Sequence, residues 1–155
     1  WVEEPLRRLV DDARALLALV LHPSGQVLAQ HGFTRAVDVM SACALAAAIH
    51  ASSSELGRQL EGQPFAGLHH AGRQRQIFLA QASTSRGAYL CLTVFDQASS
   101  LGLVRLYFDE FRIALASAAS GSSSAGTPVD EAIALADNFE TDLNRNLAAL
   151  FGRTG

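Results

Sequence analysis

The chain has 155 residues, a length that fits one domain with a short additional segment. Hydrophobic residues make up 49% of it, enough for a buried core, and the formal net charge is only −3 at pH 7. All twelve basic residues are arginines, and they form no basic run. Because proteins that bind nucleic acid usually concentrate basic residues on one face or stripe, we expect no nucleic-acid partner.

Neither the cysteines nor any apolar run points to secretion or to a membrane span. Cys43 and Cys91 lie inside apolar segments without CxxC spacing, so we interpret both as core residues. The uncharged run 39–54 is rich in alanine and interrupted by His50. A membrane span needs about 20 strongly apolar residues. We therefore expect a cytoplasmic protein with no membrane span.

The first part of the chain predicts a helix followed by a β-hairpin. Apolar residues recur at helical spacing in 2–14. The run 16–21 is apolar and ends in a Pro-Ser-Gly turn sequence at 23–25. We expect 27–30 to return beside it as an antiparallel strand.

Residues 36–60 predict the longest helix, since they contain no proline and a single glycine, Gly57. From 41 to 51 this helix is apolar nearly all round, which a helix with one solvent-facing side is not. Its second face carries small residues that permit close approach of another protein surface. We therefore expect this helix to have two partners, of which its own sheet is one.

The remainder of the domain predicts three strands and another helix. The strands are expected at 65–70, 76–82 and 88–95, and the helix from 101 to about 116. The strand at 88–95 has apolar side chains on both of its faces, as a central strand covered on both sides does. The order of elements predicts an α+β sandwich with a mostly antiparallel sheet over residues 1–116.

The C-terminal part predicts a separate element. Residues 117–127 are rich in glycine and serine, as flexible linkers are. Residues 128–152 then predict a helix with Thr127 as its N-cap and Pro128 at its first position. Its apolar stripe contains Leu135, Phe139, Leu143, Leu147 and Leu150. The stripe must be covered, either by the chain's own domain or by a partner, and we interpret Phe139, Leu143 and Leu147 as partner-binding.

No catalytic, cofactor or metal motif is present in the sequence. His69 and His70 are adjacent, so on a strand they point to opposite faces and cannot share a metal. The phosphate loop, the dinucleotide fingerprint and the nucleophile elbow are all missing. We therefore expect a protein that is not an enzyme and has no cofactor.

Several segments resemble the bacterial MglB-like branch of the roadblock/LC7 family. They are LHHAG at 68–72, VFD at 94–96, SLGLVRL at 100–106 and the hairpin at 19–28. The most specific is the Phe-Asp pair followed by SLGLVRL, where the last strand leads into the third helix. The resemblance covers about 9–115, and the predicted C-terminal helix is similar to the tail of MglB-type proteins.

The resemblance implies a roadblock/LC7 (profilin-like) α/β/α sandwich. Such domains have a five-stranded antiparallel sheet with one long helix on one face and two helices on the other. They form homodimers by joining sheet edges and pairing the long helices.

The resemblance also implies a function. MglB-type dimers bind the GTP form of a small Ras-like GTPase of the MglA type and stimulate GTP hydrolysis. They do so without an arginine finger, by moving the GTPase's own catalytic residues into place, in processes such as cell polarity and motility. On this chain the partner-binding residues of the long helix would be the small residues Ala44, Ala47, Ala48, Ala51 and Ser52.

Three alternatives stay open at this point. A roadblock adaptor would bind its partners independently of nucleotide. A small-ligand sensor would need a concave, partly polar pocket, against which the packed character of 88–95 argues. An arginine finger could come from Arg73, Arg75 or Arg86, although we interpret these as solvated turn residues.

Overall fold

A computed structural model describes residues 1–33 and 37–125, with side chains described up to Gly121. The chain divides into two units, Trp1–Ala116 and Ser117–Gly155. The predicted C-terminal helix, with Phe139, Leu143 and Leu147, lies outside the described residues. The fold described below is that of the first unit.

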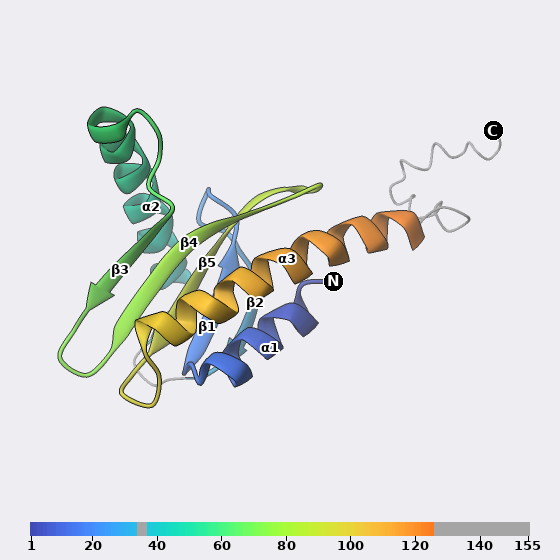
Figure 1. The fold of residues 1–155 in the computed structure, drawn as a ribbon, viewed down its shortest axis with the longest axis horizontal. Coiled ribbons are helices and arrows are strands. Elements are labelled where there is room, and N and C mark those ends of the chain that lie inside the picture. The colour runs from blue at the N-terminus through green and yellow to red at the C-terminus, as the bar shows by residue number, and fades with distance from the viewer. Residues whose placement is uncertain (34–36, 126–155) are drawn as a thin grey trace. The chain divides into compact units, whose positions relative to one another are not determined.

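The first unit is a single antiparallel sheet between two layers of helices (Figure 1). Its elements are α1 (Glu3–Ala13), β1 (Leu17–Leu21), β2 (Val27–Gly32), α2 (Val39–Glu61), β3 (Gly67–Ala71), β4 (Gln76–Thr84), β5 (Gly87–Phe95) and α3 (Leu101–Ala125). The five strands are ordered β2-β1-β5-β4-β3, and every neighbouring pair is antiparallel. Helix α2 covers one face, and α1 and α3 cover the other (Figure 1). The predicted α+β sandwich, with one long helix on one face of a five-stranded antiparallel sheet and two helices on the other, is confirmed.

Strand β5 lies at the centre of the sheet and separates two apolar cores. Cys91 and Phe95 point to the core under α1 and α3, where they join Phe108. Leu90 and Leu92 point to the opposite core, under α2. All of these side chains are at most 6% exposed. The alternating pattern of 88–95 therefore predicted a strand covered on both faces, and this prediction is confirmed.

Both cysteines are free and buried core residues. Burial raises the pKa of the Cys91 thiol to about 12, and it also raises the pKa of Cys43. Since a thiol is reactive only as the thiolate, both groups are inert at neutral pH. The interpretation of the two cysteines as small core residues is confirmed.

Helix α3 is longer than the sequence predicted. It continues to Ala125, through most of the range 117–127 that composition identified as a linker. Extending an existing helix adds one hydrogen bond for each residue fixed and avoids the cost of nucleation. The alanines in this range also favour the helix. Serine and glycine content therefore did not indicate where α3 ends.

Two glycines with similar left-handed backbone differ in their surroundings, and this difference predicts a stability contrast. Alanine at Gly32 (φ +88°) would place its Cβ 2.3 Å from the Leu16 carbonyl oxygen, whereas alanine at Gly62 (φ +81°) would meet no atom within 4 Å. Both substitutions cost about 1–2 kcal/mol for the backbone conformation. We expect Gly32→Ala to lower the free energy of unfolding by a further ~1–3 kcal/mol, measured by urea titration at equal protein concentration. Equal decreases in the free energy of unfolding for the two variants would contradict the close packing at Gly32.

Candidate functional site

Helix α2 buries only one of its sides against the sheet. Its buried residues are Cys43, Ala46, Ala47, Ser54 and Gly57, which recur at helical spacing. All five are small, so the helix lies close to the strands but removes little of its own surface from solvent. Val39, Ala42 and Ile49 are partly buried against the same core, and most of the remaining residues of this largely apolar helix are exposed.

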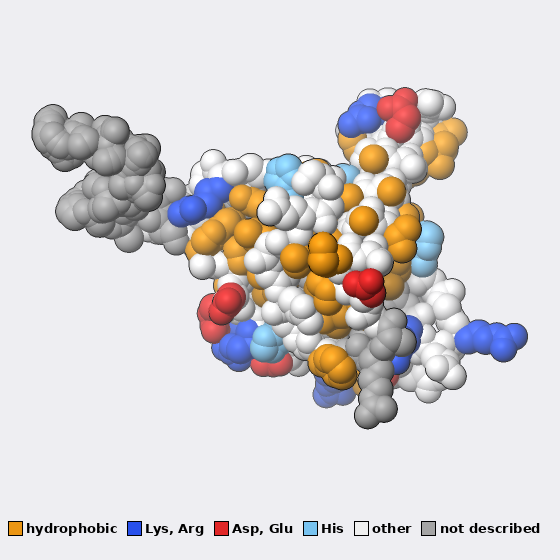
Figure 2. Space-filling view, turned by 180° about the vertical axis from the view of Figure 1, so that it is seen from behind, with side chains coloured by type: hydrophobic (Ala, Val, Ile, Leu, Met, Phe, Trp, Pro, Cys, Tyr) orange, Lys and Arg blue, Asp and Glu red, His pale blue; other side chains and the backbone are white. Residues whose placement is uncertain are grey.

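A row of large apolar side chains runs along one uncovered side of α2. This leucine stripe consists of Leu45, Ile49, Leu56 and Leu60, which are four, seven and four residues apart, and its half-buried member Ile49 also packs against the core under α2. Leu45, Leu56 and Leu60 are 64%, 51% and 68% exposed. Figure 2 shows apolar side chains along this helix when the molecule is viewed from behind. Exposed large apolar side chains that gather on one helix mark a candidate contact surface.

The leucine stripe borders a shallow groove between α2 and β3. The groove has a volume of about 410 Å³. It is lined by Ala48, Ile49, Ser52, Ser53 and Leu56 of α2 and by Phe65, Leu68 and His70 in and before β3. Most of this lining is apolar. β3 is an edge strand that pairs with β4 alone, so within the described residues its other side has no partner strand.

A second uncovered surface of α2 is made of small side chains. This alanine face consists of Ala44, Ala48 and Ala51, all exposed and spaced four and three residues apart. Ser52 is also exposed and lies next to this face. With no side-chain atoms beyond Cβ, the alanine face permits close approach of a flat partner.

The structure separates Ala47 from the other proposed partner-binding residues. Ala47 is 9% exposed and belongs to the core under α2, whereas its neighbour Ala48 is exposed. A direct contact of Ala47 with a partner would therefore need α2 to move away from the sheet. The five residues proposed from the sequence do not form one surface.

Among the described residues, α2 is the one helix long and apolar enough to cross a membrane by length and composition. The mean hydropathy of its most apolar window is 1.2, and 17% of that window is buried. One helix of this kind is weak evidence for a span. Its Cys43 and Ala46 pack against the sheet, as expected for a helix of a folded domain.

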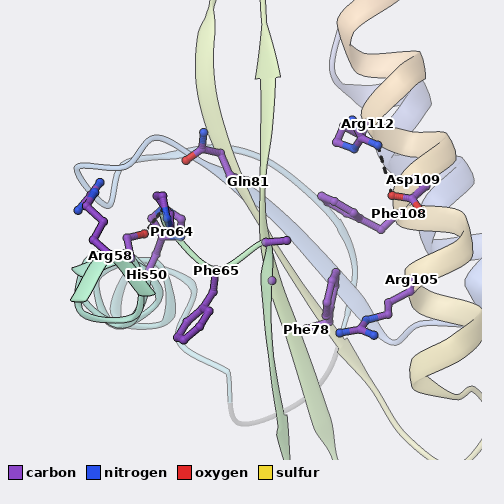
Figure 3. Close-up of a pocket in the computed structure, with 13 residues that line it drawn as sticks. His50, Arg58, Pro64, Phe65, Phe78, Gln81, Arg105, Phe108, Asp109 and Arg112 are labelled. Atoms are coloured by element: carbon purple, nitrogen blue, oxygen red, sulfur yellow. Dashed lines mark hydrogen bonds and ion pairs between the residues drawn. The ribbon is translucent and has the colours of Figure 1, made fainter. Parts of the chain in front are cut away.

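A larger cavity, the edge cleft, opens at the edge of the sheet beside β3. Its volume is about 760 Å³. Its lining consists of His50, Ser54 and Arg58 of α2, Pro64–Gly67 at the start of β3, Phe78 and Gln81 of β4, and Arg105, Phe108, Asp109 and Arg112 of α3. Figure 3 shows Arg58 on the α2 side, Gln81 between the helices, and Arg105 and Arg112 on the α3 side. No sequence pattern indicated this cleft, because its residues come from three distant segments.

Polar contacts in the edge cleft are few and long. Arg112 Nη2 lies 3.5 Å from Asp109 Oδ1, and Ser54 Oγ lies 3.4 Å from His50 Nε2. The guanidinium of Arg105 lies 5.8 Å from the centre of the Phe78 ring. Burial lowers the pKa of His50, and the positive charge of Arg58 lowers it further. A hydrogen bond with Gln81 acts in the opposite direction but does not outweigh burial. His50 is therefore neutral at pH 7.

The described residues hold no group of three His, Cys, Asp or Glu side chains that could bind a metal ion. His69 and His70 point to opposite faces, as their adjacency predicted. His69 stacks on Phe95 at 6.2 Å between ring centres, and His70 lines the groove beside β3. Arg73 and Arg86 lie exposed in the β3–β4 and β4–β5 turns. Arg86 lies 5.0 Å from the centre of the Trp1 ring.

Solved structures with this fold include MglB proteins. MglB from Myxococcus xanthus superposes with a TM-score of 0.66 at 26% sequence identity, over 75% of this chain and 92% of that one. The gliding protein MglB from Thermus thermophilus gives 0.65 at 25% identity, over 76% and 87%. A roadblock/LC7 domain from Streptomyces avermitilis gives 0.62 at 15% identity, over 73% and 92%, and supports the fold alone.

Comparisons of the sequence itself give no match. No protein-family model matches it, and no curated protein sequence does. The likeness to MglB is therefore carried by the three-dimensional arrangement, together with the short segments that resemble the family.

The different placement of two neighbouring alanines predicts different effects of the same substitution. Ala47→Arg would bury a charge with no partner, so we expect it to lower the free energy of unfolding by more than about 2 kcal/mol. Ala48→Arg lies on the surface and should change this free energy by no more than about 0.5 kcal/mol. Urea unfolding followed by circular dichroism measures both. Similar losses for the two variants would mean that α2 is rotated relative to this structure.

Proposed function

We propose that this chain, which carries an MglB-like roadblock/LC7 domain, is a cytoplasmic homodimeric regulator of a small Ras-like GTPase. The GTPase is of the MglA type, and the regulator binds its GTP form and stimulates GTP hydrolysis. The observation that carries the proposal is the single-sided burial of α2, which leaves the leucine stripe and the alanine face uncovered. Two exposed surfaces on one helix fit two different protein partners.

The leucine stripe and β3 together fit a second copy of the chain. An unpaired edge strand is a template for another strand. The apolar row beside it favours association because removing apolar surface from water lowers the free energy. If the β3 edges of two copies paired, the two sheets would become one and the α2 helices would lie side by side. This contact would be isologous, with the same patch used by both copies, as in most homodimers.

The alanine face fits the GTPase. A flat surface of small side chains suits a globular partner better than a deep pocket suits a small ligand. In a dimer formed through β3 and the leucine stripe, Ala44 and Ala51, which do not line the groove beside β3, would stay accessible on both copies. A regulator that binds there would act by stabilising one arrangement of the GTPase's own catalytic residues.

An arginine finger is not part of the proposal. Arg73, Arg75 and Arg86 are exposed residues in and beside the two turns that flank β4, not residues of α2. In this proposal the regulator acts only through its partner's active site, and the predicted C-terminal helix (128–152) supplies an additional docking element.

The dimer is tested by charged residues in the leucine stripe. We expect Leu45→Glu/Leu56→Glu to convert the dimer into a monomer, because pairing would bury four like charges across the twofold axis. Sedimentation-velocity centrifugation measures the change. The matched control is Ile113→Glu, which replaces an apolar residue that is 65% exposed on α3, on the other face of the sheet. A wild-type monomer, or a dimer that survives the double substitution, would refute this interface.

Regulation is tested by GTP hydrolysis of an MglA-type GTPase with and without the protein. We expect wild-type protein to stimulate hydrolysis, and Ala48→Arg/Ala51→Arg to reduce the stimulation at least about tenfold by preventing close approach. Leu106→Arg, at a residue that is 53% exposed on α3, is the control with the same added side chain. Replacing Arg73, Arg75 and Arg86 together by alanine should leave the stimulation of GTP hydrolysis intact. Comparing a chain that ends at Gly126 with the full chain measures how much the C-terminal helix contributes to the stimulation.

The same assay separates regulation from the adaptor alternative. Stable binding of the GTPase in both nucleotide states without stimulation would make the protein an adaptor. Loss of stimulation in the triple alanine variant would establish an arginine finger instead. If neither binding nor stimulation occurred, the proposed partner class would be wrong.

A further inference from the structure

We propose that the edge cleft binds an extended acidic segment of a partner protein, which adds to β4 as a short strand in line with β3. No residue of the leucine stripe or the alanine face lines this cleft, and Phe65 lines both the cleft and the neighbouring groove beside β3. Arg105 and Arg112 lie on α3, on the opposite side of the sheet from α2 (Figure 3). The proposal therefore does not depend on the GTPase or on the dimer.

The first argument is the unequal length of β3 and β4. Pairing between them runs from Ala71↔Gln76 to Gly67↔Ala80, so the four β4 residues Gln81–Thr84 extend beyond the start of β3. On one side these residues pair with β5. On the other side no described strand pairs with them, and Gln81 lines the edge cleft there. A free stretch of strand next to a cleft is the geometry in which an extended peptide adds to a sheet.

The second argument is the charge of the cleft. Three arginines line it, and Asp109 is its one carboxylate, which gives a local charge of +2 (three minus one) with His50 neutral. The chain as a whole carries −3. Arg58 and Arg112 form exposed ion pairs of 3.3 and 3.5 Å with Glu55 and Asp109 of their own helices. Exposed pairs of this kind are weak, so both guanidinium groups can exchange to an incoming carboxylate.

The third argument is the position of the arginines on both sides of the sheet edge. Successive side chains of a strand point to opposite faces. On a strand added to β4, one set would point toward Arg58 of α2, and the next toward Arg105 and Arg112 of α3 (Figure 3). Adjacent acidic residues would therefore each meet a guanidinium. Three phenylalanines also line the cleft and would accept a flanking apolar side chain: Phe65, Phe78 and Phe108.

These features favour a peptide over nucleic acid. The three arginines lie on two faces around one strand edge, whereas a nucleic-acid backbone needs basic groups along one continuous track. The net negative charge of the chain also opposes a long polyanion.

The probe for this proposal is a fluorescein-labelled peptide of about ten residues that repeats Val-Glu-Glu, compared with its Val-Lys-Lys counterpart. We expect the full-length protein to bind the glutamate peptide in a salt-sensitive manner and not the lysine peptide, measured by fluorescence anisotropy. Arg105→Glu/Arg112→Glu should weaken binding about tenfold or more. The matched control, Arg73→Glu, reverses the charge of an exposed arginine outside the cleft and should leave affinity unchanged within about twofold.

A second measurement tests strand addition independently of charge. Bound peptide should slow amide hydrogen exchange within Gln81–Thr84, where new backbone hydrogen bonds form. Circular dichroism checks that the variants are folded, and Arg58→Glu on α2 replaces the double variant if that one unfolds. The proposal is overturned by any of four results: no binding, equal binding of the two peptides, equal weakening by Arg73→Glu, or protection confined to other segments.

Discussion

The structure depends on the burial of β5 on both of its faces. This strand pairs with β1 and β4, and its alternate side chains reach two separate cores. Cys91 and Phe95 pack in the core under α1 and α3, and Leu90 and Leu92 pack in the core under α2. Because its side chains pack against both helix layers, this one strand constrains where each layer lies.

For α2 the constraint leaves most of the helix available to partners. The fully buried residues that α2 contributes are small, among them Cys43 and Ala46, since β1 and β5 supply most of the large side chains beneath it. The three leucines of the leucine stripe and the alanine face lie outside this core and expose apolar surface at a cost in solvation. That cost is offset when a partner covers them, and the proposed dimer and GTPase contacts would do so.

At the other end of the sheet, unequal strand lengths create a second kind of surface. β3 has five residues and β4 has nine, so the free part of β4 lies between α2 and α3 with basic side chains on both sides. The contrast with α2 is chemical. The leucine stripe offers a large apolar area, whereas the edge cleft offers backbone hydrogen bonds and guanidinium groups, which fit an acidic, extended ligand.

The sequence by itself determined the order of elements, the central position of 88–95, the buried cysteines and the second exposed face of the long helix. These follow from local periodicity, which side-chain burial imposes directly. It did not determine which alanine of α2 faces the sheet, because Ala47 and Ala48 are alike in an alanine-rich helix and only packing against β1 and β5 fixes the rotation. The edge cleft was also decided by tertiary structure alone, since Arg58 and Arg105 come to line one cavity only after the sheet has paired.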